Sequence, residues 1–165
     1  MRVLLTDDSK TIRMVLRDVL TQLGHTDVLE AENGAKALEI VALGGVEVLL
    51  LDLHMPVLDG LGTLKQLKSD PKTAGIPVVI ISSDTDMRVI DQARQLGAIG
   101  YIKKPFKADA MQKALAVALE TQRRASTSGR QTTGGTSELP AVEAGDAKSA
   151  DAKPENKGWM KRILG

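Results

Sequence analysis

Short apolar runs alternate with amphipathic segments over the first 121 residues of the chain. The runs occupy residues 2–6, 26–31, 46–51, 76–82 and 100–104. Each run has the length of a strand, and those at 46–51 and 76–82 are almost continuously apolar, as is typical of parallel strands buried on both faces.

The segments between these runs have helical periodicity. In the first, apolar residues recur at i, i+3, i+4, i+7, i+8 and i+11 from Ile12 to Leu23, with Ser9 as the expected N-cap and Gly24 past the C-terminus. Further helices are expected at 34–43, 61–68, 87–96 and from 107 to about 121. Five strand–helix units in succession predict an α/β fold, a parallel sheet with helices on both faces.

The pattern ends at about Thr121, so we expect a single domain over residues 1–121. Residues 122–157 are rich in Ser, Thr, Gly, Ala and Pro without apolar periodicity, which predicts a flexible low-complexity linker. The last segment, 158–165, is GWMKRILG.

The last segment has the pattern of a short amphipathic motif. Its apolar residues Trp159, Met160, Ile163 and Leu164 flank Lys161 and Arg162. It could anchor the chain to a protein groove or an anionic membrane surface. It could also be an end without function, or pack on its own domain.

Composition excludes several classes. The formal net charge is +1, which argues against a nucleic-acid partner. There is no cysteine, which excludes disulfides and thiolate metal sites. The sequence has neither the long apolar run of a membrane span nor a signal-peptide core, so we expect a soluble, cytoplasmic protein.

Polar residues gather where the predicted strands end. Asp7 and Asp8 follow the first strand, Asp52 the third, Ser82 ends the fourth and Lys104 the fifth. The carboxyl ends of parallel strands share one edge, where such folds bind ligands. Three carboxylates with a hydroxyl and an ammonium suit Mg²⁺ and a phosphoryl group, with ionised Asp52 as nucleophile. Each residue alone could be a cap or a surface residue, but their coincidence favours a site.

These residues lie in motifs that resemble a known family. Asp7-Asp8, LLLDLHMPVLDG (49–60), IPVVIISS (76–83) and GYIKKPF (100–106) occur in the order and spacing of the receiver domain of two-component response regulators, in its single-domain, CheY-like form. The resemblance covers about residues 1–121. It implies a flavodoxin-like (βα)5, doubly wound five-stranded sheet with strand order 2-1-3-4-5.

The resemblance also implies a phosphoacceptor site. Asp52 would accept a phosphoryl group from a sensor histidine kinase or a phosphotransfer protein. Asp8 and Asp52 would bind Mg²⁺ together with the backbone carbonyl of His54, whose side chain would point outward, and Asp7 would contribute through water.

Further roles follow from the resemblance. Ser82 and Lys104 would contact the phosphoryl oxygens, and the Lys104-Pro105 bond would be cis. Ser82 and Tyr101 would form a switch pair that alters the face made by helix 87–96, strand 100–104 and the last helix, where a downstream protein would bind. His54 and Asp84 occupy positions at which the family tunes the lifetime of the phosphoryl group.

We therefore expect a signalling phosphoacceptor, a monomer or weak dimer, rather than an enzyme with a separate substrate. Alternatives are a phosphorelay intermediate that passes the group to another histidine, a phosphorylation-independent binding module, and a phosphohydrolase or nucleotide binder. The last is disfavoured because no Gly-rich phosphate loop follows the first strand and no second carboxylate lies two residues after Asp52.

Overall fold

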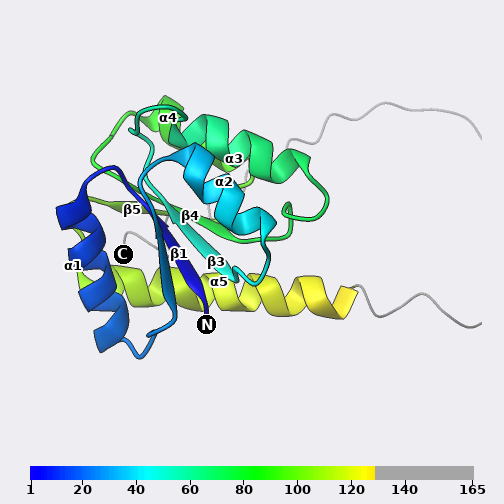
Figure 1. Cartoon of the computed structure of the whole chain (residues 1–165), viewed down its shortest axis with the longest axis horizontal. Coiled ribbons are helices and arrows are strands. Elements are labelled where there is room, and N and C mark those ends of the chain that lie inside the picture. The colour runs from blue at the N-terminus through cyan, green and yellow to red at the C-terminus, as the bar shows by residue number, and fades with distance from the viewer. Residues whose placement is uncertain (129–165) are drawn as a thin grey trace, which may run out of the picture.

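The computed structural model describes residues 1–128 and contains alternating strands and helices around one parallel sheet (Figure 1). The elements are β1 (Val3–Thr6), α1 (Lys10–Gln22), β2 (Val28–Ala31), α2 (Gly34–Ala42), β3 (Val48–Leu51), α3 (Gly60–Ser69), β4 (Val78–Ser82), α4 (Met87–Gln95), β5 (Gly100–Lys103) and α5 (Ala108–Ser128). The five strands lie in the order β2-β1-β3-β4-β5, all parallel. This confirms the predicted doubly wound fold and its strand order.

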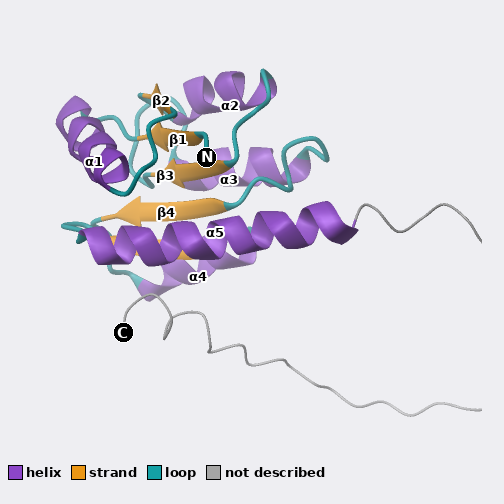
Figure 2. Ribbon diagram, turned by 90° about the horizontal axis from the view of Figure 1, so that it is seen from below, coloured by secondary structure: helices purple, strands orange, loops and turns teal. Residues whose placement is uncertain are grey.

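Helices cover both faces of the sheet (Figures 1 and 2). One face packs on α2, α3 and α4, through residues such as Val41, Leu64 and Ile90. The other packs on α1 and α5, through residues such as Leu20 and Met111. Every residue of β3 and β4 is buried, because the strands have helices on both sides.

Local signals position most helix ends. The Ser9 side chain accepts a hydrogen bond from the Ile12 amide at 3.4 Å, as expected for the N-cap of α1. Asn33 and Asp59 cap α2 and α3 in the same way. Most of the predicted strands begin one or two residues before the strands of the structure.

The last helix differs from its prediction. α5 continues to Ser128, seven residues beyond the expected end at Thr121, so the first part of the expected linker is helical. Two contacts support the extension: Gln122 Nε2 donates to the Glu47 carbonyl at 2.6 Å, and Arg124 pairs with Glu120 one turn earlier at 2.9 Å. The rest of the linker, and the 158–165 motif, lie outside the described residues.

Among residues 1–128, no helix combines the length and the apolar character needed to cross a bilayer.

Candidate functional site

Three carboxylates meet at the carboxyl edge of the sheet. Asp7 and Asp8 follow β1, and Asp52 follows the neighbouring β3, whose register pairs Thr6 with Leu51. One oxygen from each carboxylate lies within 4.8 Å of the others. Asp7 and Asp52 are buried, whereas Asp8 is exposed, so the cluster has a buried floor and one open side.

Lys104 compensates this negative charge. Its Nζ lies 2.6 Å from Asp7 Oδ2 and 3.2 Å from Asp52 Oδ1. It follows β5, and its peptide bond to Pro105 is cis, as predicted. Burial raises the pKa of Asp52, Lys104 lowers it, and repulsion from Asp7 raises it again, with a net rise. One ammonium therefore does not fully offset two buried carboxylates.

The loop after Asp52 is fitted closely against the site. Gly60 begins α3 with no room for a side chain, because a Cβ there would lie 2.2 Å from the Asp52 carbonyl oxygen. Within the same loop Val57 has φ of 70°, a left-handed conformation that is unfavourable for a β-branched residue, and its side chain is 84% exposed. The path from Asp52 to α3 is thus fixed by the close backbone approach at Gly60 together with Leu53, whose side chain is buried in the core.

The predicted switch residues both contact the backbone of Asp84. Ser82 Oγ, which is fully buried, accepts a hydrogen bond from the Asp84 amide at 3.1 Å. The Tyr101 hydroxyl donates to the Asp84 carbonyl and, at 3.3 Å, to that of Ser82. Burial and the nearby Asp84 and Asp52 raise the pKa of Tyr101, so its hydroxyl stays protonated as a donor. Both residues are coupled through the β4–α4 loop.

The His54 side chain points outward and is 66% exposed, in line with the sequence prediction. Its Nε2 lies 3.2 Å from Asp84 Oδ2, so this pair bridges the loops after β3 and β4. Asp84 Oδ1 also accepts a hydrogen bond from the Asp86 amide, the N-cap of α4, at 2.8 Å. The sequence marked His54 and Asp84 as separate positions, but gave no signal for their contact.

Comparison with known proteins agrees with this geometry. The family model described as "Response regulator receiver domain" matches residues 3–116. The chain belongs to this family. The chemotaxis protein CheY1 of Helicobacter pylori is 36% identical over 122 residues, which make up 73% of this chain and 98% of that protein. A CheY homologue of Campylobacter jejuni is 34% identical over 122 residues, 73% of this chain and 94% of its own.

Solved structures show the same likeness. The chemotaxis protein CheY4 of Vibrio cholerae has a TM-score of 0.61 at 26% identity, over 74% of this chain and 96% of that one. NtrX of Brucella abortus has a TM-score of 0.72 at 30% identity over 83% of this chain. This receiver spans only 31% of the NtrX chain. The relationship to CheY, by contrast, extends over nearly the whole of the related protein.

The acidic cluster of this receiver fits a magnesium ion. Its donors are all carboxylate oxygens, the hard ligands that Mg²⁺ prefers, and one of the three residues is exposed and leaves room for bound water. The oxygen donors of Asp7, Asp8 and Asp52 therefore fit Mg²⁺, the ion that receiver domains typically bind at an acidic pocket.

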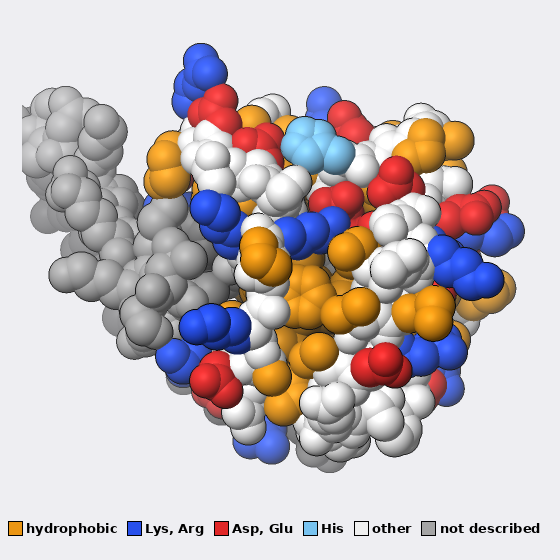
Figure 3. All heavy atoms as spheres, turned by 90° about the vertical axis from the view of Figure 1, so that its left-hand side faces the viewer, with side chains coloured by type: hydrophobic (Ala, Val, Ile, Leu, Met, Phe, Trp, Pro, Cys, Tyr) orange, Lys and Arg blue, Asp and Glu red, His pale blue; other side chains and the backbone are white. Residues whose placement is uncertain are grey.

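The space beside this cluster is open to solvent. A hollow of about 360 Å³ is bounded by Asp8, the loop from Leu53 to Pro56, Asp59, Leu61 and Val89. Figure 3 looks onto this end of the receiver: charged side chains surround a central band of apolar side chains. Met14 and Val15 of α1 are 57% and 46% exposed.

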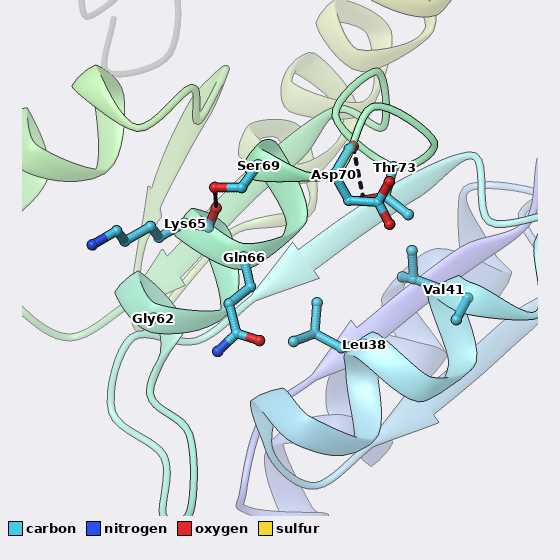
Figure 4. A pocket seen from close by; sticks show the side chains of 9 residues that line it. Leu38, Val41, Gly62, Lys65, Gln66, Ser69, Asp70 and Thr73 are labelled. Carbon is cyan, nitrogen blue, oxygen red and sulfur yellow. Dashed lines mark hydrogen bonds between the residues drawn. The ribbon is translucent and has the colours of Figure 1, made fainter.

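A wider groove lies between α2 and α3, away from the acidic cluster (Figure 4). It has a volume of about 680 Å³, and its lining includes Leu38, Val41, Gln66 and Asp70. None of the predicted site residues within 1–128 lines it. The predicted phosphoacceptor residues lie instead at the carboxyl edge of the sheet.

Proposed function

We propose that this receiver is a response regulator of CheY type that accepts a phosphoryl group on Asp52. The single observation that carries the proposal is the position of this carboxylate. It is 7% exposed, lies 3.2 Å from an ammonium, and has two more carboxylates within 4.8 Å on the side where Mg²⁺ fits. This arrangement leaves a nucleophile that is ionised at neutral pH and whose neighbours suit a phosphoryl group.

The proposed reaction transfers phosphorus from nitrogen to oxygen. An Asp52 carboxylate oxygen attacks the phosphorus of a phosphohistidine on a kinase or phosphotransfer protein. The P–N bond breaks, its electron pair stays on the leaving imidazole, and an acyl phosphate forms on Asp52. Bound Mg²⁺ would neutralise charge on the phosphoryl oxygens. Lys104 would exchange its carboxylate contacts for a phosphoryl oxygen, and the Ser82 hydroxyl would donate to another.

Transfer to Asp52 consumes the carboxylate until the acyl phosphate is hydrolysed. In this proposal the protein is therefore a signalling phosphoacceptor with intrinsic phosphotransfer and dephosphorylation, and it has no separate substrate that turns over. A relay role, in which the group passes on to another histidine, uses the same site and is the second candidate.

The proposed output is a change at the face formed by α4, β5 and α5. Its support is that Ser82 and Tyr101 both contact the backbone of Asp84: a Ser82 hydroxyl drawn toward a phosphoryl group would give up its hydrogen bond from the Asp84 amide. The same residue's carbonyl accepts from Tyr101, so the loop that leads to α4 would change with it. A downstream protein that binds this face only after the change would produce a chemotaxis- or motility-type response.

Acetyl phosphate tests the phosphoacceptor. With Mg²⁺, intact-mass spectrometry should detect one added phosphoryl group on the wild type and none on Asp52→Ala. The matched control is Asp109→Ala, an exposed acid in the first turn of α5, which should be labelled like the wild type. Labelling that persists in Asp52→Ala would overturn the assignment.

Beryllofluoride, a phosphoryl mimic, tests the output face. With Mg²⁺ it should shift the amide resonances of α4, β5 and α5 as well as those of the acidic edge. If the shifts stay within the loops that carry the carboxylates and residues 87–111 do not respond, the proposed output face is wrong.

A further proposal concerns the 158–165 motif, whose Trp159 would anchor the receiver to a partner protein or an anionic membrane and so raise its local concentration there. Deleting residues 158–165 should leave acetyl-phosphate labelling intact but reduce signalling. Unchanged signalling and localisation would refute the anchor.

A further inference from the structure

Arg13 of α1 turns its side chain back toward the loop that carries the acidic pair. The side chain is only 12% exposed, although the residue lies on an outer helix. Its Nη1 donates to the backbone carbonyls of Asp7, at 2.8 Å, and Asp8, at 3.3 Å. One guanidinium nitrogen therefore holds two consecutive peptide units, each belonging to a predicted Mg²⁺ ligand.

The guanidinium is itself held from the edge of the sheet. Arg13 Nε donates to Glu30 Oε2 at 3.0 Å, and Glu30 lies on β2, paired in register with Leu5 of β1. The other carboxylate oxygen, Oε1, lies 2.6 Å from Nη2 of Arg17, one turn further along α1. Both oxygens of Glu30 are thus engaged, which fixes the plane in which Arg13 reaches the loop.

These contacts complete the restraints on the loop. The Asp7 amide donates to the Ala31 carbonyl at 3.2 Å, and Asp7 Oδ1 accepts from the Ser9 amide at 2.9 Å. Arg13 adds a restraint on the carbonyls of Asp7 and Asp8, and so on the backbone from which both carboxylates project. A rigid, forked side chain with a permanent charge is well suited to holding carbonyls in place.

We propose that Arg13, anchored by Glu30, is a positioning residue that orients Asp7 and Asp8 for a divalent cation. The inference rests on the proposed function in that the cation is the Mg²⁺ of the phosphoacceptor site. It concerns cation binding by the unphosphorylated protein. The alternative is that Arg13 has only a structural role and links α1 to β2 through Glu30, as Arg17 does.

Mg²⁺ titration by isothermal calorimetry distinguishes the two. Arg13→Gln should weaken Mg²⁺ binding by about tenfold, the lower end of what is lost when a residue that orients a metal ligand is removed. Arg13→Lys keeps the charge but loses the fork, and should weaken binding nearly as much. Arg17→Gln is the matched control, because it removes another partner of the same Glu30. Among residues 1–128, Arg17 forms no hydrogen bond or ion pair with Asp7 or Asp8. Its Mg²⁺ affinity should therefore stay within about twofold of the wild type.

A second readout separates positioning from loss of structure. Labelling of Arg13→Gln by acetyl phosphate should be slow at low Mg²⁺ and return to the wild-type rate when Mg²⁺ is saturating. Glu30→Gln leaves Arg13 in place but loosens its anchor, and should weaken Mg²⁺ binding by an intermediate factor. This variant keeps the test decisive if Arg13→Gln does not fold.

Two results would overturn the inference: unchanged Mg²⁺ affinity in Arg13→Gln, or an equal loss in Arg13→Gln and Arg17→Gln. If Arg13→Gln does not fold and Glu30→Gln does, an unchanged Mg²⁺ affinity of Glu30→Gln would also overturn the inference. Failure of the proposed function would look different, since the wild type would then bind Mg²⁺ normally and the Arg13 effect on affinity would stand, while Asp52 remained unlabelled by acetyl phosphate.

Discussion

Replacing Asp52 by Asn should make the metal-free protein harder to unfold, although it removes the proposed phosphoacceptor. Asp52 is buried beside Asp7, and the two share the ammonium of Lys104. Asn has the same shape and can still accept a hydrogen bond from Lys104 through its amide oxygen. The substitution therefore changes the charge of the site while leaving its packing in place.

Three effects of the substitution oppose one another. Carboxylate oxygens within 4.8 Å of each other repel by about 3 kcal/mol at an effective dielectric constant of 20, whereas Asp52 and Lys104, at 3.2 Å, attract by about 5 kcal/mol on the same scale. Removing the Asp52 charge therefore loses more attraction to Lys104 than it relieves repulsion from Asp7, and relief from burying a charge, the largest cause of the raised pKa, decides the sign. Because the pKa of Asp52 is raised on balance, the ionised form is a net cost, and we expect Asn to increase the free energy of unfolding by about 1–2 kcal/mol.

The pH dependence has a definite sign. The folded protein holds the Asp52 proton more tightly than the unfolded chain, whose carboxyl has an ordinary pKa of 3.8. The cost of ionisation is fully present above the raised pKa, declines as the pH falls through that value, and is gone below 3.8. The advantage of Asn should therefore be full at neutral pH and vanish in acid.

Urea unfolding in the presence of EDTA, followed by far-UV circular dichroism, measures the effect. Trp fluorescence is unsuitable because the single Trp, Trp159, lies outside residues 1–128, which form the described fold. Asp18→Asn, an exposed acid on α1, is the control and should change little. Saturating Mg²⁺ should reverse the order, since a ligand at 100 times its Kd stabilises the wild type by about 2.7 kcal/mol. Equal stability of the wild type and Asp52→Asn at neutral pH, or a gain that persists in acid, would refute the reasoning.

Three further substitutions test other parts of the site by the same unfolding measurement. Lys104→Met leaves buried carboxylates without their ammonium and should lower the free energy of unfolding by about 3 kcal/mol in EDTA. Lys103→Met, at the exposed neighbouring residue, is the control and should be nearly neutral. Equal losses in the two variants would contradict the pairing of Lys104 with the carboxylates. Val57→Asn places a residue that tolerates positive φ at a strained position and should raise the free energy of unfolding by about 1 kcal/mol. Leu43→Asn, at an equally exposed residue with φ of −72°, should leave the free energy of unfolding unchanged. Equal effects of the two substitutions would rule out backbone strain at Val57. Gly60→Ala should lower the free energy of unfolding by about 1–3 kcal/mol and slow labelling by acetyl phosphate, because its Cβ would displace the backbone of the phosphoacceptor. Labelling at the wild-type rate would contradict this.

Much of this receiver could be read from local sequence. Apolar runs and helical periodicity gave all the strands and helices in order, because each element has to bury its own face and so carries its own pattern. Capping residues such as Ser9 marked helix starts. Asp52 and Lys104 could be selected because the carboxyl ends of parallel strands share one edge. The predicted end of α5 was wrong, because the hydrogen bond that supports the longer helix, from Gln122 to Glu47, joins residues far apart in the chain.

The contacts between elements were decided only by the tertiary structure. Lys104 reaches Asp7 across 97 residues, and His54 reaches Asp84 across 30. The position of Arg13 under the acidic pair depends on Glu30, which the register of β2 against β1 places beside α1. Periodicity along the chain reports which face of an element is buried, but it does not report which side chains meet there. Sheet order and register determine those meetings, and with them the charge balance around Asp52.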